Sequence, residues 1–260
     1  EEAPSRIREL EDWKIGWARE GIRIKQVMAP GHNVERCVYV DFLNTGPAVA
    51  KTLRTQVRRQ DHLRRAGELA ITNVAVEEGQ VVGAVGLNLG TGEAVRIDAK
   101  AVILAAGGLT RLYRRNSASV NMGGDAYALA LRAGAGLIDM EFVQFFPIGH
   151  LAPRMVGMDP IMWDPFRYKL GGRLLNGDGE EFVQNYGHAE ATDKYTAPRD
   201  VASYAILQEV AAGRGSPAGG AFLSFEHISE TELRQAFGSV IDRLAANDID
   251  LTKRSIEVAP

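Results

Sequence analysis

Two adjacent glycines end a continuous apolar run in the middle of the chain, an arrangement that brings backbone close to a ligand. The run covers residues 101–106, and Gly107 and Gly108 follow it directly. Glycine has no Cβ atom, so paired glycines let the main chain approach a bulky cofactor. A near-continuous apolar run of this length fits a strand buried on both faces, as in a parallel sheet. The sequence therefore predicts a buried strand that ends beside a cofactor.

An arginine with a carboxylate neighbour is the second feature that could do chemistry. Arg199 follows Pro198 and precedes Asp200, at a predicted helix start. A guanidinium is a poor base by itself because its pKa lies above about 12. A carboxylate neighbour and burial would have to make transient proton loss possible. The alternative is a surface ion pair between Arg199 and Asp200.

Composition narrows the class of protein. The 260 residues are 45% hydrophobic and 24% charged, which is ordinary for a globular protein of one large or two smaller domains. A net charge of -3 gives no basic excess, so we expect no nucleic-acid partner. One cysteine, Cys37, excludes an internal disulfide and cannot by itself build a zinc site or an iron–sulfur cluster. We expect a buried or half-buried thiol and a reducing compartment.

The ends of the chain and its hydropathy suggest a soluble interior piece of a longer protein. No apolar run approaches the roughly 20 residues that a membrane helix needs, so we expect no direct membrane insertion. No signal peptide is visible, and the chain begins with Glu1 and stops at Pro260.

Hydrophobic periodicity and turn signals predict the elements that position these groups. We expect helices over 5–13, 47–59, 125–135, 198–212 and 229–246, the last opened by a capping box of Ser229 and Glu232. We expect strands over 38–42, 71–76, 81–87, 94–97, 101–106 and 171–176. After Pro147 the sequence becomes rich in predicted loops, and Pro147 is therefore the predicted domain boundary.

Several motifs occur in an order that is highly specific. They are Ala-Lys-Ala-Val-Ile-Leu-Ala-Ala-Gly-Gly at 99–108, Gly-Gly-Asp at 123–125, Asp-Met-Glu-Phe-Val-Gln-Phe at 139–145, a Gly-Gly-x-Leu-x-Asn-type stretch at 171–182, Pro-Arg-Asp at 198–200, Gly-Arg-Gly at 213–215, and Ile-Glu-Val-Ala-Pro at 256–260. In this order the chain resembles the succinate dehydrogenase/fumarate reductase flavoprotein family of FAD-dependent oxidoreductases, over nearly its whole length.

The resemblance implies a fold class, α/β with an α+β capping domain. It implies a partial FAD-binding Rossmann-like domain over 1–147, a substrate-capping domain over 148–256, and the start of a return to the FAD domain over 257–260. The family's opening Gly-x-Gly-x-x-Gly turn, which holds the FAD pyrophosphate, is absent from these 260 residues. This absence also favours an interior fragment.

The resemblance also implies cofactor contacts. Ala106, Gly107 and Gly108 are expected near FAD, and Val74 is expected to face the adenine. Asp125 matches a family residue that contacts FAD; on physical grounds alone it is a helix N-cap, and both can hold.

For catalysis, Arg199 matches the family's proton-transferring arginine. Asp164 and Arg167 lie where the family has a Glu-x-x-Arg relay, with Asp in place of Glu.

The main departure from the family lies at the substrate. Members that act on succinate or fumarate read Gln-Phe-His-Pro-Thr, whereas this chain has Phe146 and Ile148 in place of the His and Thr. Apolar side chains cannot hydrogen-bond a carboxylate, and an unpaired buried charge costs several kcal/mol. His150 is a candidate substitute; the alternative is a structural histidine.

The resemblance implies an FAD-dependent flavoprotein subunit that transfers hydride between flavin and a small carboxylic acid such as succinate or fumarate. It further implies that the partner is an iron–sulfur protein subunit. The location implied is cytoplasmic and peripheral to the inner membrane through partner subunits. Alternatives are an L-aspartate oxidase or adenylylsulfate reductase-like flavoprotein, and a catalytically silent scaffold or interaction fragment.

Overall fold

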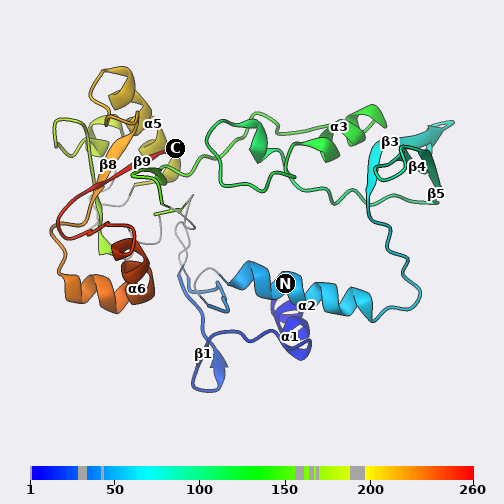
Figure 1. Cartoon of the computed structure of the whole chain (residues 1–260), viewed down its shortest axis with the longest axis horizontal. Helices are drawn as coiled ribbons and strands as arrows, with labels where there is room; N and C mark the ends of the chain where they lie inside the picture. Colours follow the sequence, from blue (N-terminus) through cyan, green and yellow to red (C-terminus); the bar gives the residue numbers. More distant parts are fainter. Residues whose placement is uncertain are drawn as a thin grey trace. The chain divides into compact units, whose positions relative to one another are not determined.

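The computed structural model describes residues 2–28, 34–41, 44–155, 161–163, 167, 170–187 and 197–260. The chain divides into two compact units, Glu1–Leu69 and Ala70–Pro260 (Figure 1), and each is described by itself. Across the described ranges, every helix falls short of the length and apolar character that a bilayer crossing requires.

The first unit contains two helices and a short hairpin. Helix α1 covers Ala3–Asp12 and α2 covers Thr45–Arg58, which confirms both predicted helices. Between them, β1 (Arg19–Glu20) pairs antiparallel with β2 (Arg23–Ile24). The indole N–H of Trp17 donates to the Ile7 carbonyl over 3.3 Å, which fixes the chain against α1.

The strand predicted over 38–42 is wrong for residues 38–41, and residue 42 lies outside the described residues. Within the described part, pairing here consists of a single bridge between Val27 and Cys37 and one hydrogen bond from the Ala18 N–H to the Tyr39 carbonyl. A strand needs a continuous ladder, and a single bridge does not supply one. Cys37 is half-buried, in line with the expected thiol.

The second unit opens with an antiparallel sheet of β3 (Leu69–Glu77), β4 (Gln80–Asn88) and β5 (Ala94–Asp98), in that order. These strands confirm the predicted hairpin and its neighbour. Glu78 and Gly79 both have positive φ, at 51° and 78°, as a two-residue hairpin turn requires.

The predicted buried strand over 101–106 is wrong. These residues form no strand, and Ile103 is 91% exposed. Among the described residues no strand pairs with this segment, and the preceding strand β5 pairs with β4. An apolar run becomes a buried strand only where a ladder and two covering layers exist.

A short 3-10 helix η1 (Thr110–Leu112) and helix α3 (Asp125–Arg132) follow. The reading of Asp125 as an N-cap is corrected, since the N-cap is Gly124, with φ 86° in the left-handed region. Asp125 is the first helical residue, where a carboxylate is favoured by the helix dipole. Gly134, with φ 90°, terminates α3 near the predicted end.

A second antiparallel sheet has the order β6-β9-β8-β7. Its strands are β6 (Gly149–Ala152), β7 (Arg173–Leu175), β8 (Ala221–Ser224) and β9 (Ile256–Ala259). The 3-10 helix η2 (Val183–Tyr186) and helices α5 (Arg199–Ala211) and α6 (Glu230–Ala245) accompany it. These elements confirm the strand predicted over 171–176 and both late helices.

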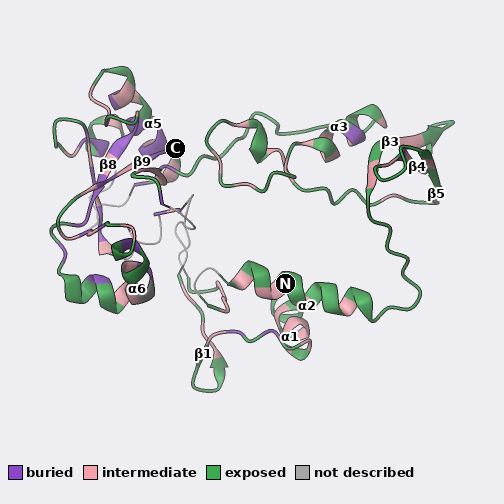
Figure 2. Ribbon diagram, viewed as in Figure 1, coloured by how far each residue is buried: buried purple, intermediate pink, exposed green. Residues whose placement is uncertain are grey.

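The core of the second unit lies among these late elements. Figure 2 shows buried residues concentrated on α5, β8 and β9, while β3 to β5 and the chain around α3 contain few buried residues. Trp163, Leu223 and Ile206 are completely buried. Helix α6 starts with the predicted capping box, in which the Ser229 hydroxyl accepts from the Glu232 N–H.

A buried ionic network fixes α5 to its surroundings. The Glu209 carboxylate accepts two hydrogen bonds of 2.9 Å from Arg214, one of 3.0 Å from Asn176, and one from the Tyr186 hydroxyl. The hydrogen bonds from Arg214, followed by those from Tyr186 and Asn176, outweigh burial and lower the pKa of Glu209 to about 2. The hydrogen bond to Glu209 raises the pKa of Tyr186 in turn. The network explains why the Gly-Arg-Gly turn at 213–215 carries an arginine.

Candidate functional site

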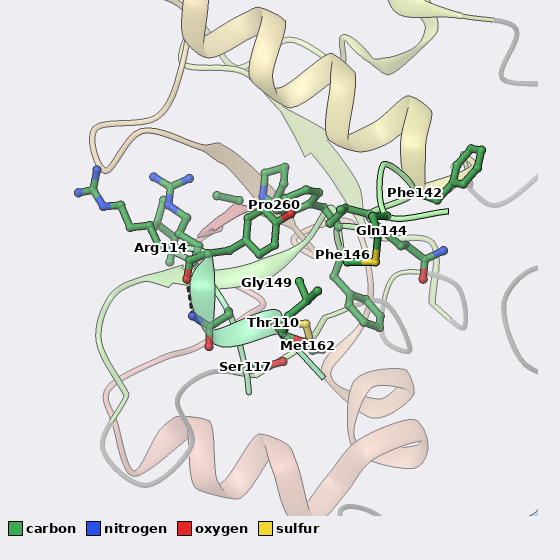
Figure 3. A pocket seen from close by; sticks show the side chains of 18 of the residues that line it. Thr110, Arg114, Ser117, Phe142, Gln144, Phe146, Gly149, Met162 and Pro260 are labelled. Carbon is green, nitrogen blue, oxygen red and sulfur yellow. Dashed lines mark hydrogen bonds between the residues drawn. The ribbon is translucent and has the colours of Figure 1, made fainter. Parts of the chain in front are cut away.

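A cavity of about 500 Å³ opens in the second unit. Its lining comes from residues 109–110, 113–117, 127, 138–140, 142–146, 149–151, 162 and 259–260. Figure 3 shows Arg114 on one side and Phe142, Gln144 and Phe146 on the other, with Gly149 and Pro260 between them. This volume is within the range of about 300–1,000 Å³ that is typical of sites for small molecules.

The glycine pair lies at the edge of this cavity. Gly108 accepts a hydrogen bond of 3.1 Å from the Gly124 N–H, which joins the two glycine pairs of the sequence. Leu109 and Thr110, the next two residues, line the cavity. Ala106 and Gly107 are exposed, and within the described part no acceptor takes the backbone N–H of residues 106–108. Accessible backbone donors without bulky side chains suit close approach by a large ligand.

Arg199 is held against the wall of the cavity. Its Nη1 donates to the Gln144 Oε1 over 3.2 Å, and its guanidinium carbon lies 4.4 Å from the centre of the Phe146 ring. The Ser203 hydroxyl, one turn further along α5, donates to the Phe145 carbonyl over 3.4 Å. Two contacts therefore fix the start of α5 to the segment 144–146, and Arg199 is more than a partner of Asp200.

Arg167 is buried, with 2% of its surface exposed, which is rare for an arginine. Its backbone N–H donates to the Trp163 carbonyl over 3.0 Å. A buried guanidinium destabilises the fold unless hydrogen bonds or an opposite charge compensate it, so Arg167 requires such contacts from its surroundings. Asp164, the predicted carboxylate of the relay, lies outside the described residues.

Phe146 and Ile148 have different environments. Phe146 lines the cavity, and its ring lies under Arg199. Ile148 is completely buried, and its carbonyl accepts a hydrogen bond of 3.1 Å from the Trp163 N–H. A ligand in the cavity therefore meets Phe146 and not the side chain of Ile148.

His150 lines the cavity with both ring nitrogens engaged. Its Nδ1 accepts a hydrogen bond of 3.1 Å from the Trp163 indole N–H, which can only donate. Its Nε2 lies against the Pro153 carbonyl, which can only accept. These partners define a neutral ring with its proton on Nε2. The ring therefore bridges Trp163 and Pro153 as a structural group.

Two predicted cofactor contacts lie apart from the cavity lining. Val74 is half-buried in β3, and Asp125 is exposed at the start of α3. Neither lines the cavity. Their roles toward a cofactor stay predictions.

Sequence reasoning missed the contribution of the segment 109–117. Tyr113 packs edge-on against Phe145, with ring centres 5.2 Å apart, and Arg114 and Arg115 line the cavity. Arg115 also donates to the Gly219 carbonyl over 3.2 Å. The signal was a cluster of basic and aromatic residues, Arg-Leu-Tyr-Arg-Arg at 111–115, directly after the glycine pair.

The family described as FAD binding domain matches the chain over residues 1–260. A fumarate reductase (CoM/CoB) subunit of Methanothermobacter marburgensis is 34% identical over 262 residues, which cover 100% of this chain and 46% of that protein. L-aspartate oxidase of Neisseria meningitidis is 32% identical over 234 residues, 88% of this chain and 44% of that protein. A solved structure of Escherichia coli quinol fumarate reductase has a TM-score of 0.83 at 28% identity and covers 99% of this chain and 45% of that chain. The chain spans less than half the length of these relatives.

These similarities confirm the predicted α/β fold class and the predicted cofactor class, since the matched family binds FAD. The exposed backbone at Ala106 and Gly107 fits the cofactor, because glycine lets a large ligand approach closely. The chain therefore belongs to the FAD binding domain family, as its resemblance to the flavoprotein subunits of succinate dehydrogenase and fumarate reductase predicts.

Proposed function

We propose that this chain is part of an FAD-dependent oxidoreductase that transfers hydride between flavin and a small carboxylic acid, such as the succinate/fumarate pair. The observation that carries the proposal is the position of Arg199, which Gln144 and Phe146 hold beside a cavity that begins directly after the glycine pair. FAD, when bound, supplies the hydride chemistry, and residues 106–108 would approach it.

Arg199 supplies or accepts the proton at the substrate carbon in this proposal. The Gln144 amide fixes the direction of the guanidinium, and the Phe146 ring covers one of its faces. The contact with the ring is attractive for a cation and helps to hold the guanidinium in place. Arg167 and Asp164 would return the proton; the burial of Arg167 supports a role away from solvent.

The remaining parts of the proposal concern the domains and the partners. The sheet that starts at Gly149 supports a capping domain that begins near residue 148, after a cofactor-binding part over 1–147. The names of the relatives, which describe subunits, support a multi-subunit assembly. In this proposal the electron partner is an iron–sulfur subunit. Attachment to a membrane would be peripheral and through such partners.

A second candidate is oxidation of an amino acid of the L-aspartate type. The similarity to L-aspartate oxidase favours it, and the departure from the succinate/fumarate pattern at Phe146 and Ile148 keeps it open. The two candidates differ in their substrate and share the role of Arg199.

The test uses the protein at its full natural length. Flavin absorbance after gel filtration shows first whether FAD is retained; a colourless protein would support the silent alternative. In stopped-flow measurements of flavin oxidation and reduction with candidate acids, we expect Arg199→Gln to slow the chemical step about 1,000-fold. Arg199→Lys should retain part of the rate.

Arg243→Gln is the matched control, because Arg243 is an exposed arginine on α6. It should react at the wild-type rate. If Arg199→Gln also stays within about twofold of wild type while it retains flavin, Arg199 does not transfer the proton and the proposal fails.

A further inference from the structure

The wall of the cavity beside Arg199 is apolar. It is formed by Met140, Phe142, Val143, Phe145, Phe146 and Met162. Phe146 occupies the face of the Arg199 guanidinium, at 4.4 Å from the ring centre. A ligand that reaches Arg199 along this wall therefore contacts thioether, aliphatic and aromatic groups.

The charged lining residues lie elsewhere in the cavity. Arg114 and Arg115 line it, and Figure 3 shows Arg114 on the side opposite Phe142 and Phe146. Asp139, which also lines the cavity, is negative and repels a carboxylate. The cavity thus has a cationic side and an apolar side, which is the pattern that fits an anion with an apolar body.

The polar groups near Phe146 do not replace a carboxylate receptor. The ring nitrogens of His150 are engaged by Trp163 and Pro153, in the neutral form. Gln144 holds Arg199 through its Oε1, and a neutral amide does not offset a carboxylate charge. Among the described lining residues on this side of the cavity, a carboxylate beside Phe146 would therefore find no compensating charge besides the covered guanidinium of Arg199.

Resting on the proposed function, we propose that the substrate pair is an α,β-unsaturated monocarboxylic acid and its saturated product, with an alkyl or aryl group in place of a second carboxylate. In the reducing direction the C=C π bond breaks and two C–H bonds form. The acid gains a hydride, for which reduced flavin is the source, and a proton from Arg199. FAD, when bound, would supply the two electrons of this reduction, and Arg167 and Asp164 would return the proton to Arg199, as in the proposed function. Phe146 is the residue that determines specificity, through contact with the alkyl or aryl group.

Binding is measured first, because it needs no turnover. Calorimetric titration of the full-length, oxidised, FAD-loaded protein compares succinate with butanoate and 3-phenylpropanoate. We expect the monocarboxylates to bind about tenfold more tightly or better. Their binding should carry the negative heat-capacity change of apolar burial. Equal or tighter binding of succinate would overturn the inference.

Phe146→His restores a hydrogen-bond donor at the wall and should shift the preference toward succinate by about tenfold or more. Leu207→His is the control, since Leu207 is 53% exposed on α5 and is not a lining residue of the cavity. It should leave the preference within about twofold. If both variants shift the preference alike, Phe146 does not determine specificity.

Reoxidation of the reduced protein then separates the two proposals. Crotonate and cinnamate should reoxidise the flavin faster than fumarate does. If fumarate is about tenfold faster, the monocarboxylate inference fails and the proposed function stands. If none of these acids, nor any other small carboxylic acid, reoxidises the flavin, the proposed function fails as well.

Discussion

The stretches on the two sides of Pro147 contain apolar side chains of the same kinds, yet they bury them very differently. After Pro147, Phe225 is 1% exposed and packs against Trp163, with ring centres 6.2 Å apart. Before Pro147, Ile138 is 81% exposed and Phe142 is 77% exposed. The later stretch has its own core, whereas the earlier one presents apolar side chains as the wall of a cavity. Packing and ligand contact therefore use the same residue types in different surroundings.

The sharpest test applies one substitution to both stretches. Phe225→Ala should cost about 3–5 kcal/mol because it leaves a cavity in a close-packed core. Phe142→Ala should stay within about 0.5 kcal/mol because most of the side chain is already in solvent. Amide hydrogen exchange, read separately for peptides before and after residue 147, measures both. Similar losses for the two variants would remove the distinction between the stretches.

The next largest effect concerns the charge network of the packed stretch. Glu209→Gln should cost about 2 kcal/mol at neutral pH, because it weakens the pairing with Arg214 inside the fold. The folded pKa of about 2 lies below the ordinary value of 4.5, so the carboxylate stabilises the protein above that value and loses this effect as the pH falls toward 2.

Urea unfolding at about pH 7 and about pH 3 checks the sign. The gap between wild type and Glu209→Gln should narrow at the lower pH. A gap that widens on acidification would show that Glu209 is not the stabilising anion. Glu226→Gln, at an exposed carboxylate in the same stretch, should show little change at either pH.

The smallest predicted effect concerns the start of α6. Ser229→Ala removes the side-chain acceptor of the capping box and should cost about 1 kcal/mol. Asn44→Ala, at the N-cap of α2, should cost less, because Asn44 makes no capping hydrogen bond from its side chain. Hydrogen exchange of the first turn of each helix measures the difference, and equal losses would assign no role to the capping box.

Local signals predicted local structure well. Turn residues located the β3–β4 hairpin, and the Ser229–Glu232 spacing located the start of α6, because their partners lie a few residues away. The apolar run over 101–106 failed as a strand, because burial and pairing depend on neighbours distant in sequence. The N-cap of α3 was assigned wrongly. Gly124 occupies the N-cap position in the left-handed conformation, and Asp125 is the first residue of the helix.

The same contrast between local signals and distant contacts holds for the candidate site. The motif spacing predicted Arg199 and Phe146 as site residues, and the fold places them in direct contact. The bond from Arg199 to Gln144 joins residues 55 positions apart, and the engagement of His150 by Trp163 joins residues 13 apart. Neither contact has a sequence signal of its own, since each joins segments that only the fold brings together.

The hydrogen bond from Arg115 to Gly219 joins the cationic side of the cavity to the turn before β8. Its acceptor is a main-chain oxygen, so replacing the residue at 219 cannot abolish the tether directly, whereas loss of the arginine can. Any movement of the sheet β6 to β9 away from the segment 109–117 must first break this hydrogen bond. Arg115 thus couples the cationic side of the cavity to the position of the sheet β6 to β9.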